Sequence, residues 1–155
     1  MIILILIHMK GINATELEAF KQTLPPGIRE EYFKWLITAY SVPRALFLVQ
    51  REKIESRDLN VDEWCKALGM AGELNTSEMC FNLLTGVNDN EAMKPNINPD
   101  IPIVVVVHTW GRGKKKESST LVIDGNKRLR RAFLAGRKTI KAYCLPEALA
   151  KLCIL

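Results

Sequence analysis

The stretch "LVIDGNKRLRRAFLAGRKTI", residues 121–140, carries the signals of a strand, a turn and a helix in succession. Its first residues are apolar and partly β-branched, and the Asp124-Gly125 pair that follows them is typical of a turn. Apolar residues then recur at helical spacing. The segment therefore predicts a strand that ends before the turn, a helix over residues 126–135 and a further strand over residues 139–145.

The predicted helix begins with a dense cluster of positive charge. Its four basic residues are Lys127, Arg128, Arg130 and Arg131. Cations are unfavourable at a helix N-terminus unless an anion joins them, and the free N–H groups there are well suited to a phosphate. Gly125 would let the backbone approach such a ligand closely. The pattern thus favours a phosphate site, although a solvated basic helix face behind an ordinary turn would have the same sequence.

The rest of the C-terminal half predicts one small sheet. "IPIVVVVH", residues 101–108, is a continuous β-branched run that indicates a strand in the centre of a sheet. "TWGRGKKKESS" is typical of a hairpin tip, "TLVI" forms the returning strand, and Pro146 opens a last helix at its first turn. We therefore predict an α+β (mixed α/β) fold with a small sheet flanked by helices.

The N-terminal half predicts mainly helices. One helix spans residues 13–24 with Asn13 as its cap, and a second spans about residues 28–40. Residues 44–50, "RALFLVQ", predict a short buried strand. Asn60 and Thr76 are expected to cap two further helices.

Size and composition indicate a single folded domain. The chain has 155 residues, of which 48% are hydrophobic and 25% charged, and a net charge of +5 that favours acidic partners. Its four cysteines lie in apolar contexts without a CxxC pair, which predicts reduced thiols and a cytoplasmic location: Cys65, Cys80, Cys144 and Cys153. The apolar start "MIILILI" is too short to span a bilayer, so we expect no membrane role. It predicts a buried strand or an arm that packs on a partner protein or a second copy of the chain.

Residues 121–145 resemble the signature of the ParB/sulfiredoxin superfamily. In that family a strand leads into an Asp-Gly-x-x-Arg turn, and a helix, a glycine-bearing turn and another strand follow. The matching residues are Asp124, Gly125, Arg128, Gly136 and the strand from Thr139 to Leu145. Upstream, "IPIVVVV" is similar to a family strand, and "LFLVQREKIESRDLN" is similar to the opening strand and its I-x-x-R loop, with Ile54 and Arg57. The resemblance covers about residues 44–145. It implies a domain over residues 44–155 with a helical insertion at about 60–99, and leaves residues 1–43 as an N-terminal extension of strand and helices.

This resemblance implies a nucleotide or nucleic-acid phosphate at the turn and helix start. The residues that would bind it are Gly125, Asn126, Lys127, Arg128, Arg131 and, from the opening loop, Arg57. ATP or CTP with Mg²⁺ is the implied cofactor, and nuclease or nucleotide phosphohydrolase activity is the implied chemistry. Asp124 and Glu55 are the carboxylates expected to act in catalysis, with Asp58 nearby.

The chain also departs from the family. Asn126 stands where sulfiredoxins carry their nucleophilic cysteine, so reduction of a cysteine sulfinic acid is not expected. No helix-turn-helix domain follows, so a full chromosome-partition protein is not expected either.

Two alternatives involve no catalysis. In one, a DNA-binding module uses the hairpin lysines Lys114, Lys115 and Lys116 together with the basic helix, and Trp110 stacks on a base. In the other, the apolar N-terminus mediates a regulatory protein interaction.

Overall fold

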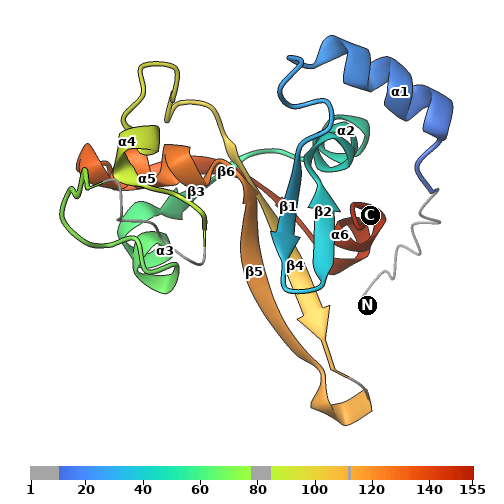
Figure 1. Ribbon diagram of the computed structural model, residues 1–155. Helices are drawn as coiled ribbons and strands as arrows, with labels where there is room; N and C mark the ends of the chain where they lie inside the picture. Colours follow the sequence, from blue (N-terminus) through green and yellow to red (C-terminus); the bar gives the residue numbers. More distant parts are fainter. Residues whose placement is uncertain (1–10, 78–84, 112) are drawn as a thin grey trace.

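The computed structural model describes residues 11–77, 85–111 and 113–155, and combines helices with two antiparallel hairpins (Figure 1). The elements in chain order are α1 (Ala14–Thr23), β1 (Tyr32–Trp35), β2 (Thr38–Ser41), α2 (Val42–Arg51), β3 (Arg57–Asn60), α3 (Val61–Ala67), α4 (Asp89–Ala92), β4 (Ile103–Trp110), η1 (Gly113–Lys115), β5 (Glu117–Asp124), α5 (Asn126–Leu134), β6 (Thr139–Leu145) and α6 (Glu147–Leu152). The predicted α+β class is confirmed.

The larger sheet has four strands in the order β3-β6-β4-β5. The long strands β4 and β5 form an antiparallel hairpin, β6 pairs parallel to β4 after the crossover through α5, and β3 closes the sheet antiparallel to β6. The β-branched run of β4 thus occupies an internal position, as its composition predicted.

Helices cover both faces of this sheet because alternate residues of each strand point to opposite sides. Val104, Val106, Leu121 and Ile123 join one buried cluster, which also contains residues of α2 and α6. Residues of the same strands that point to the other face, such as Val105, join a second buried cluster. This cluster also contains residues of α3 and α5. The sheet is therefore the middle layer, and its two faces bury separate cores.

The prediction of a helix over residues 28–40 was wrong, because Tyr32–Ser41 form the hairpin β1–β2. In β1 the more buried positions are Phe33 and Trp35, and the exposed ones alternate with them. This period of two competes with the helical spacing of the same apolar residues, and packing against α2 and β5 decides between them.

The buried strand predicted at residues 44–50 was also wrong, because this segment lies inside helix α2. Ser41 is the N-cap, and its hydroxyl accepts a hydrogen bond from the backbone N–H of Arg44 at 3.3 Å. Pro43 in the first turn suits a helix start, since the missing N–H would have no partner there. The Ser-x-Pro sequence therefore starts a helix and does not merely end the preceding element.

Other helix boundaries agree with the sequence. Asn13 caps α1 by accepting from the N–H of Thr15 at 2.9 Å, and Asn60 caps α3 by accepting from Glu63 at 3.0 Å. Pro146 immediately precedes α6 and is its N-cap residue, one position before the predicted one. Most of the helix predicted after Thr76, and all of "MIILILI" with Cys80, lie outside the described residues.

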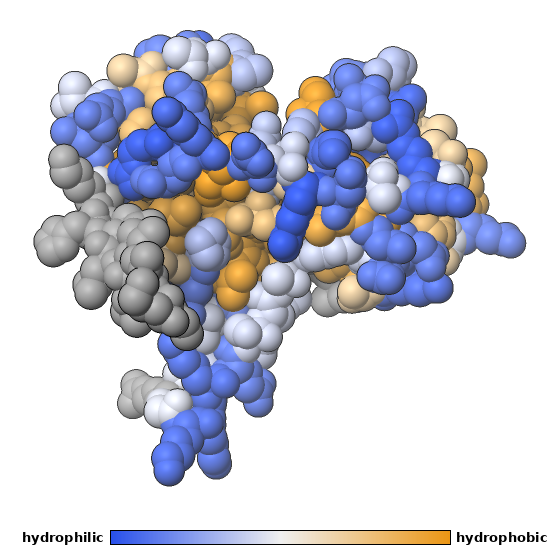
Figure 2. Space-filling view, turned by 180° about the vertical axis from the view of Figure 1, so that it is seen from behind, coloured by the Kyte–Doolittle hydropathy of each residue, from blue (hydrophilic) through white to orange (hydrophobic). Residues whose placement is uncertain are grey.

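The end of the β4–β5 hairpin projects from the body of the molecule beyond the helices (Figure 1). Its tip carries the short helix η1 and is strongly hydrophilic in the space-filling view (Figure 2). Within the described ranges, no helix is long and apolar enough to cross a membrane.

Candidate phosphate-binding site

The turn between β5 and α5 requires a glycine. Gly125 has φ 97°, a left-handed conformation that side chains rarely adopt. A Cβ at this position would lie 2.5 Å from Ile103 Cγ2 and 2.8 Å from a terminal nitrogen of Arg128. The glycine is thus needed for the turn and for packing, whether or not a ligand approaches it.

Arg128 folds back over this turn. Its Nη2 donates to Asp124 Oδ2 at 2.7 Å and to the Pro102 carbonyl at 3.3 Å. The two side chains of this ion pair are only 16% and 14% exposed. Asp124 therefore neutralises Arg128 locally and ties the helix start to the end of its own strand.

Arg130 belongs to the same basic cluster of the helix but is buried. Its guanidinium forms a two-pronged ion pair with Asp89, with both N–O distances at 2.7 Å. It also donates to the backbone carbonyls of Met70, Gly72 and Glu73 at 2.6–2.9 Å. The hydrogen bonds to Arg130 hold the pKa of the Asp89 carboxyl below its ordinary value. This arginine fastens the segment before α4 to α5, which is a structural role.

The remaining cations of the cluster also have protein partners. Lys127 Nζ lies 3.0 Å from Glu91 Oε2, and Arg131 donates to the Lys94 carbonyl. Lys94 and then Lys127 lower the pKa of Glu91 by hydrogen bonding to it. The positive charge that looked surplus in the sequence is thus largely balanced by carboxylates from α4 and β5.

Two features at the helix start still point to a polar ligand. α5 has no side-chain cap, so its first N–H groups are free of the usual intramolecular acceptor. Two buried atoms, Asn126 Oδ1 and Arg128 Nε, have no hydrogen-bond partner within the described chain. The amide of Asn126 is itself oriented by a hydrogen bond from Nδ2 to the Val122 carbonyl at 3.0 Å.

Glu31, just before β1, is a further member of this site that the sequence did not indicate. Desolvation raises the pKa of its carboxyl, the charge of Asp124 adds to the rise, and Arg128 and Lys127 oppose it. Glu31, Asp89 and Glu91 come from segments far from α5 in the chain. No local motif in the sequence could have placed them beside the basic helix.

The structure does not bring the upstream candidates to this turn. Arg57 lies on β3, at the opposite edge of the sheet from β5, about three strand spacings or ~14 Å away. Its Nε donates to Cys144 Sγ at 3.1 Å. Glu55 precedes β3 on the same side and is exposed, and Asp58 pairs with Lys141. Among the described residues no group of three His, Cys, Asp or Glu side chains could hold a metal ion.

The second basic cluster lies at the projecting hairpin tip. Lys114, Lys115 and Lys116 are all exposed there. Lys116 lies 3.3 Å from Glu147, whereas Lys114 and Lys115 form no ion pair with any described residue. Trp110, at the base of the tip, is 43% exposed and stacks on His108 with ring centroids 5.6 Å apart.

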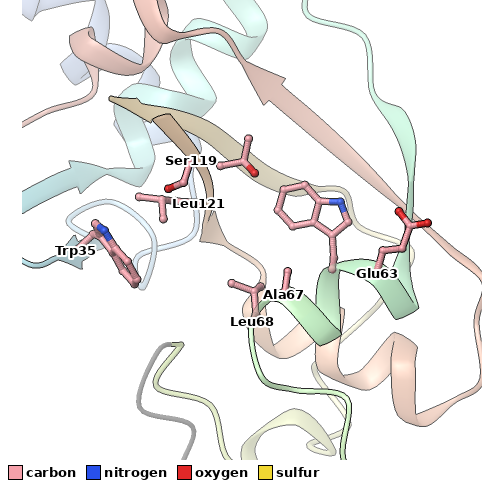
Figure 3. A pocket seen from close by; sticks show the side chains of 8 residues that line it. Trp35, Glu63, Ala67, Leu68, Ser119 and Leu121 are labelled. Atoms are coloured by element: carbon pink, nitrogen blue, oxygen red, sulfur yellow. The ribbon is translucent and has the colours of Figure 1, made fainter. Parts of the chain in front are cut away.

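A pocket of about 460 Å³ opens beside β5, between the two basic clusters. Trp35 from β1 stands on one side and Glu63 and Ala67 of α3 on the other, with Ser119 and Leu121 of β5 between them (Figure 3). Trp64 of α3 also lines the pocket. Its remaining lining residues are Leu68 and Thr120. The sequence did not indicate a site at Trp35 and Trp64, because the two belong to different elements.

No protein-family model, curated protein or solved structure matches the chain. The strand, turn, helix, glycine turn and strand of residues 117–145 do follow in the order that the resemblance implied, and Gly136 has a left-handed φ of 69°. Membership of the ParB/sulfiredoxin superfamily, and the activities it implies, remain predictions.

Proposed function

We propose that this protein binds nucleic acid through its phosphate backbone. The observation that carries the proposal is the projecting β4–β5 hairpin, whose tip presents Lys114 and Lys115 without a carboxylate partner among the described residues. Unpaired lysines on an extended arm are available to replace the counterions of a polyanion, and this release supplies most of non-specific affinity.

The start of α5 offers a second contact region for the same ligand. β5 connects it to the hairpin tip, and the eight residues of β5 from Glu117 to Asp124 extend over roughly 25 Å. The uncapped N–H groups of α5 would donate hydrogen bonds to one phosphate at the far end of this strand. The two regions together are long enough for a binding site of several nucleotides.

The test is the salt dependence of binding to a fluorescently labelled oligonucleotide, measured by anisotropy. We expect log Kd to change steeply with log salt in the wild type. In Lys114→Ser/Lys115→Ser the slope should fall by about 1.4–1.8, since each lost phosphate contact removes ~0.7–0.9.

The matched control is Lys34→Ser/Lys138→Ser, which removes the same charge from exposed lysines of β1 and the α5–β6 turn. This control should keep the wild-type slope. A similar loss in both variants would show that net charge alone matters, and the absence of salt-dependent binding in the wild type would refute the proposal.

A second candidate function is nucleotide binding at the α5 start, with ATP or CTP and Mg²⁺ as the resemblance implies. Its support is the pair of buried, unsatisfied atoms Asn126 Oδ1 and Arg128 Nε beside uncapped N–H groups. Asp124 is already engaged by Arg128, and Glu55 lies at the other side of the sheet, so the observations favour binding over hydrolysis.

Thermal-shift measurements with nucleoside mono-, di- and triphosphates, with and without Mg²⁺, test this candidate. We expect stabilisation by one nucleotide class that disappears in Asn126→Ala, because this change removes a buried acceptor but no ion pair. No shift with any nucleotide would count against it.

A further inference from the structure

We infer that the pocket beside β5 receives an unpaired nucleobase, so that the preferred ligand is single-stranded nucleic acid. This inference rests on the proposed nucleic-acid binding and specifies its substrate class. It is carried by two tryptophans, Trp35 and Trp64, that line a pocket beside β5. The two basic regions lie at the two ends of this strand.

The walls of the pocket suit a flat, apolar ring. Trp35 of β1 and Trp64 of α3 both line the pocket, and Leu68 and Leu121 contribute further apolar side chains to its walls. Figure 3 shows Trp35 on the β1 side, with Leu121 and Leu68 facing the same pocket. Both tryptophans are half-buried, so each is held by packing and still faces the opening. Aromatic side chains held in this way stack on bases with little dependence on sequence, since every base has a π-face.

The polar edge of a base would also find partners there. The hydroxyls of Ser119 and Thr120 can donate or accept, and the Glu63 carboxylate accepts. The negative charge of Glu63 disfavours a phosphate inside the pocket. The phosphates would therefore stay outside, toward the lysines of the tip and the start of α5.

The spacing along β5 fits one continuous strand of ligand. Ser119 lies three residues, or ~10 Å, from Lys116, and Asp124 lies three residues beyond Leu121 at the opposite end. A chain that contacts phosphate regions at both ends of β5 would pass its bases over the pocket. Paired bases inside a duplex are stacked and cannot enter it, so a duplex would make only the phosphate contacts.

The experiment compares three labelled ligands of about 16 nucleotides at one salt concentration: a thymidine oligomer, a duplex, and an abasic strand with the same phosphates. We expect the wild type to bind the thymidine oligomer most tightly. Trp64→Leu should weaken that binding about 5- to 150-fold, the contribution of one stacked base, and should leave the abasic strand unaffected. Trp64→Phe retains an aromatic face and should restore most of the affinity for the thymidine oligomer. A purely structural role for Trp64 would instead change the affinity for the thymidine oligomer and for the abasic strand alike.

The outcomes separate this inference from the proposed function. Equal affinity for the thymidine oligomer and the abasic strand, with the lysine variant still weakening both, would overturn the base pocket but leave phosphate binding intact. Failure of all three ligands to bind would refute the proposed function itself. Tightest binding to the duplex would likewise overturn the inference, because a pocket for an unpaired base gives a duplex no advantage.

Discussion

Replacing Asp89 with asparagine removes the carboxylate that forms a two-pronged ion pair with the buried guanidinium of Arg130. The change preserves the shape of the side chain, but a neutral amide cannot accept both hydrogen bonds that the carboxylate accepts at 2.7 Å. The two side chains are 8% and 6% exposed, so water does not replace the lost charge.

The expected loss is about 3–5 kcal/mol in the free energy of unfolding, the usual cost of removing one partner of a buried ion pair. For a domain of this size the melting temperature should fall by roughly 6–20 °C. Urea unfolding followed by tryptophan fluorescence and circular dichroism measures the change. Asp62→Asn is the matched control, because its pair with Lys66 is exposed to solvent and should contribute little to stability.

The pH dependence provides an independent check. Arg130 lowers the pKa of Asp89 in the folded state, so the stabilisation is complete above the unfolded pKa of ~3.9 and is lost as the pH falls through the folded value. The difference in stability between the wild type and Asp89→Asn should therefore shrink below about pH 4. A loss under ~1 kcal/mol at neutral pH, or a difference that does not change in acid, would refute the structural role of this pair.

Two further predictions concern the turn and the thiols. Gly125→Ala should lower the free energy of unfolding by about 2–4 kcal/mol, because it adds backbone strain and a clash with Ile103. Gly136→Ala meets open space and should cost about 1–2 kcal/mol from backbone strain alone. Thermal unfolding measures both losses, and equal losses would contradict the clash. Cys65 and Cys153, whose thiol pKa values burial raises to about 12, should be alkylated by iodoacetamide at pH 8 only after unfolding. Rapid modification of either thiol in the folded protein, detected by mass spectrometry, would disagree with their burial.

The sequence predicted the C-terminal sheet well because its signals are local and agree with one another. The apolar run of β4, the Asp124-Gly125 turn and the periodicity of α5 all indicate the same elements at the same positions. In residues 28–50 the signals conflict. Aromatic residues of β1 match both periods, and Ser41 with Pro43 can end one element or begin another, so only packing decides.

The candidate site was predictable only in part. The helix start and its glycine followed from residues 124–128, but the function of the charges did not, since Asp89 and Glu91 reach α5 through the fold. The same reason hid the pocket between Trp35 and Trp64. A sequence pattern shows which charged and aromatic side chains a segment contains. Long-range contacts in the fold decide which of these side chains remain exposed.

The projecting hairpin also contains two kinds of residue: those that the fold requires, and those at which substitutions and insertions are tolerated. Val104, Val106 and Leu121 are almost completely buried, whereas residues 113–118 beyond them are exposed and lie outside both cores. Insertions and substitutions are best tolerated at such exposed loop tips. The fold therefore tolerates change at residues 113–118, so substitutions there alter the proposed nucleic-acid contacts without loss of folding.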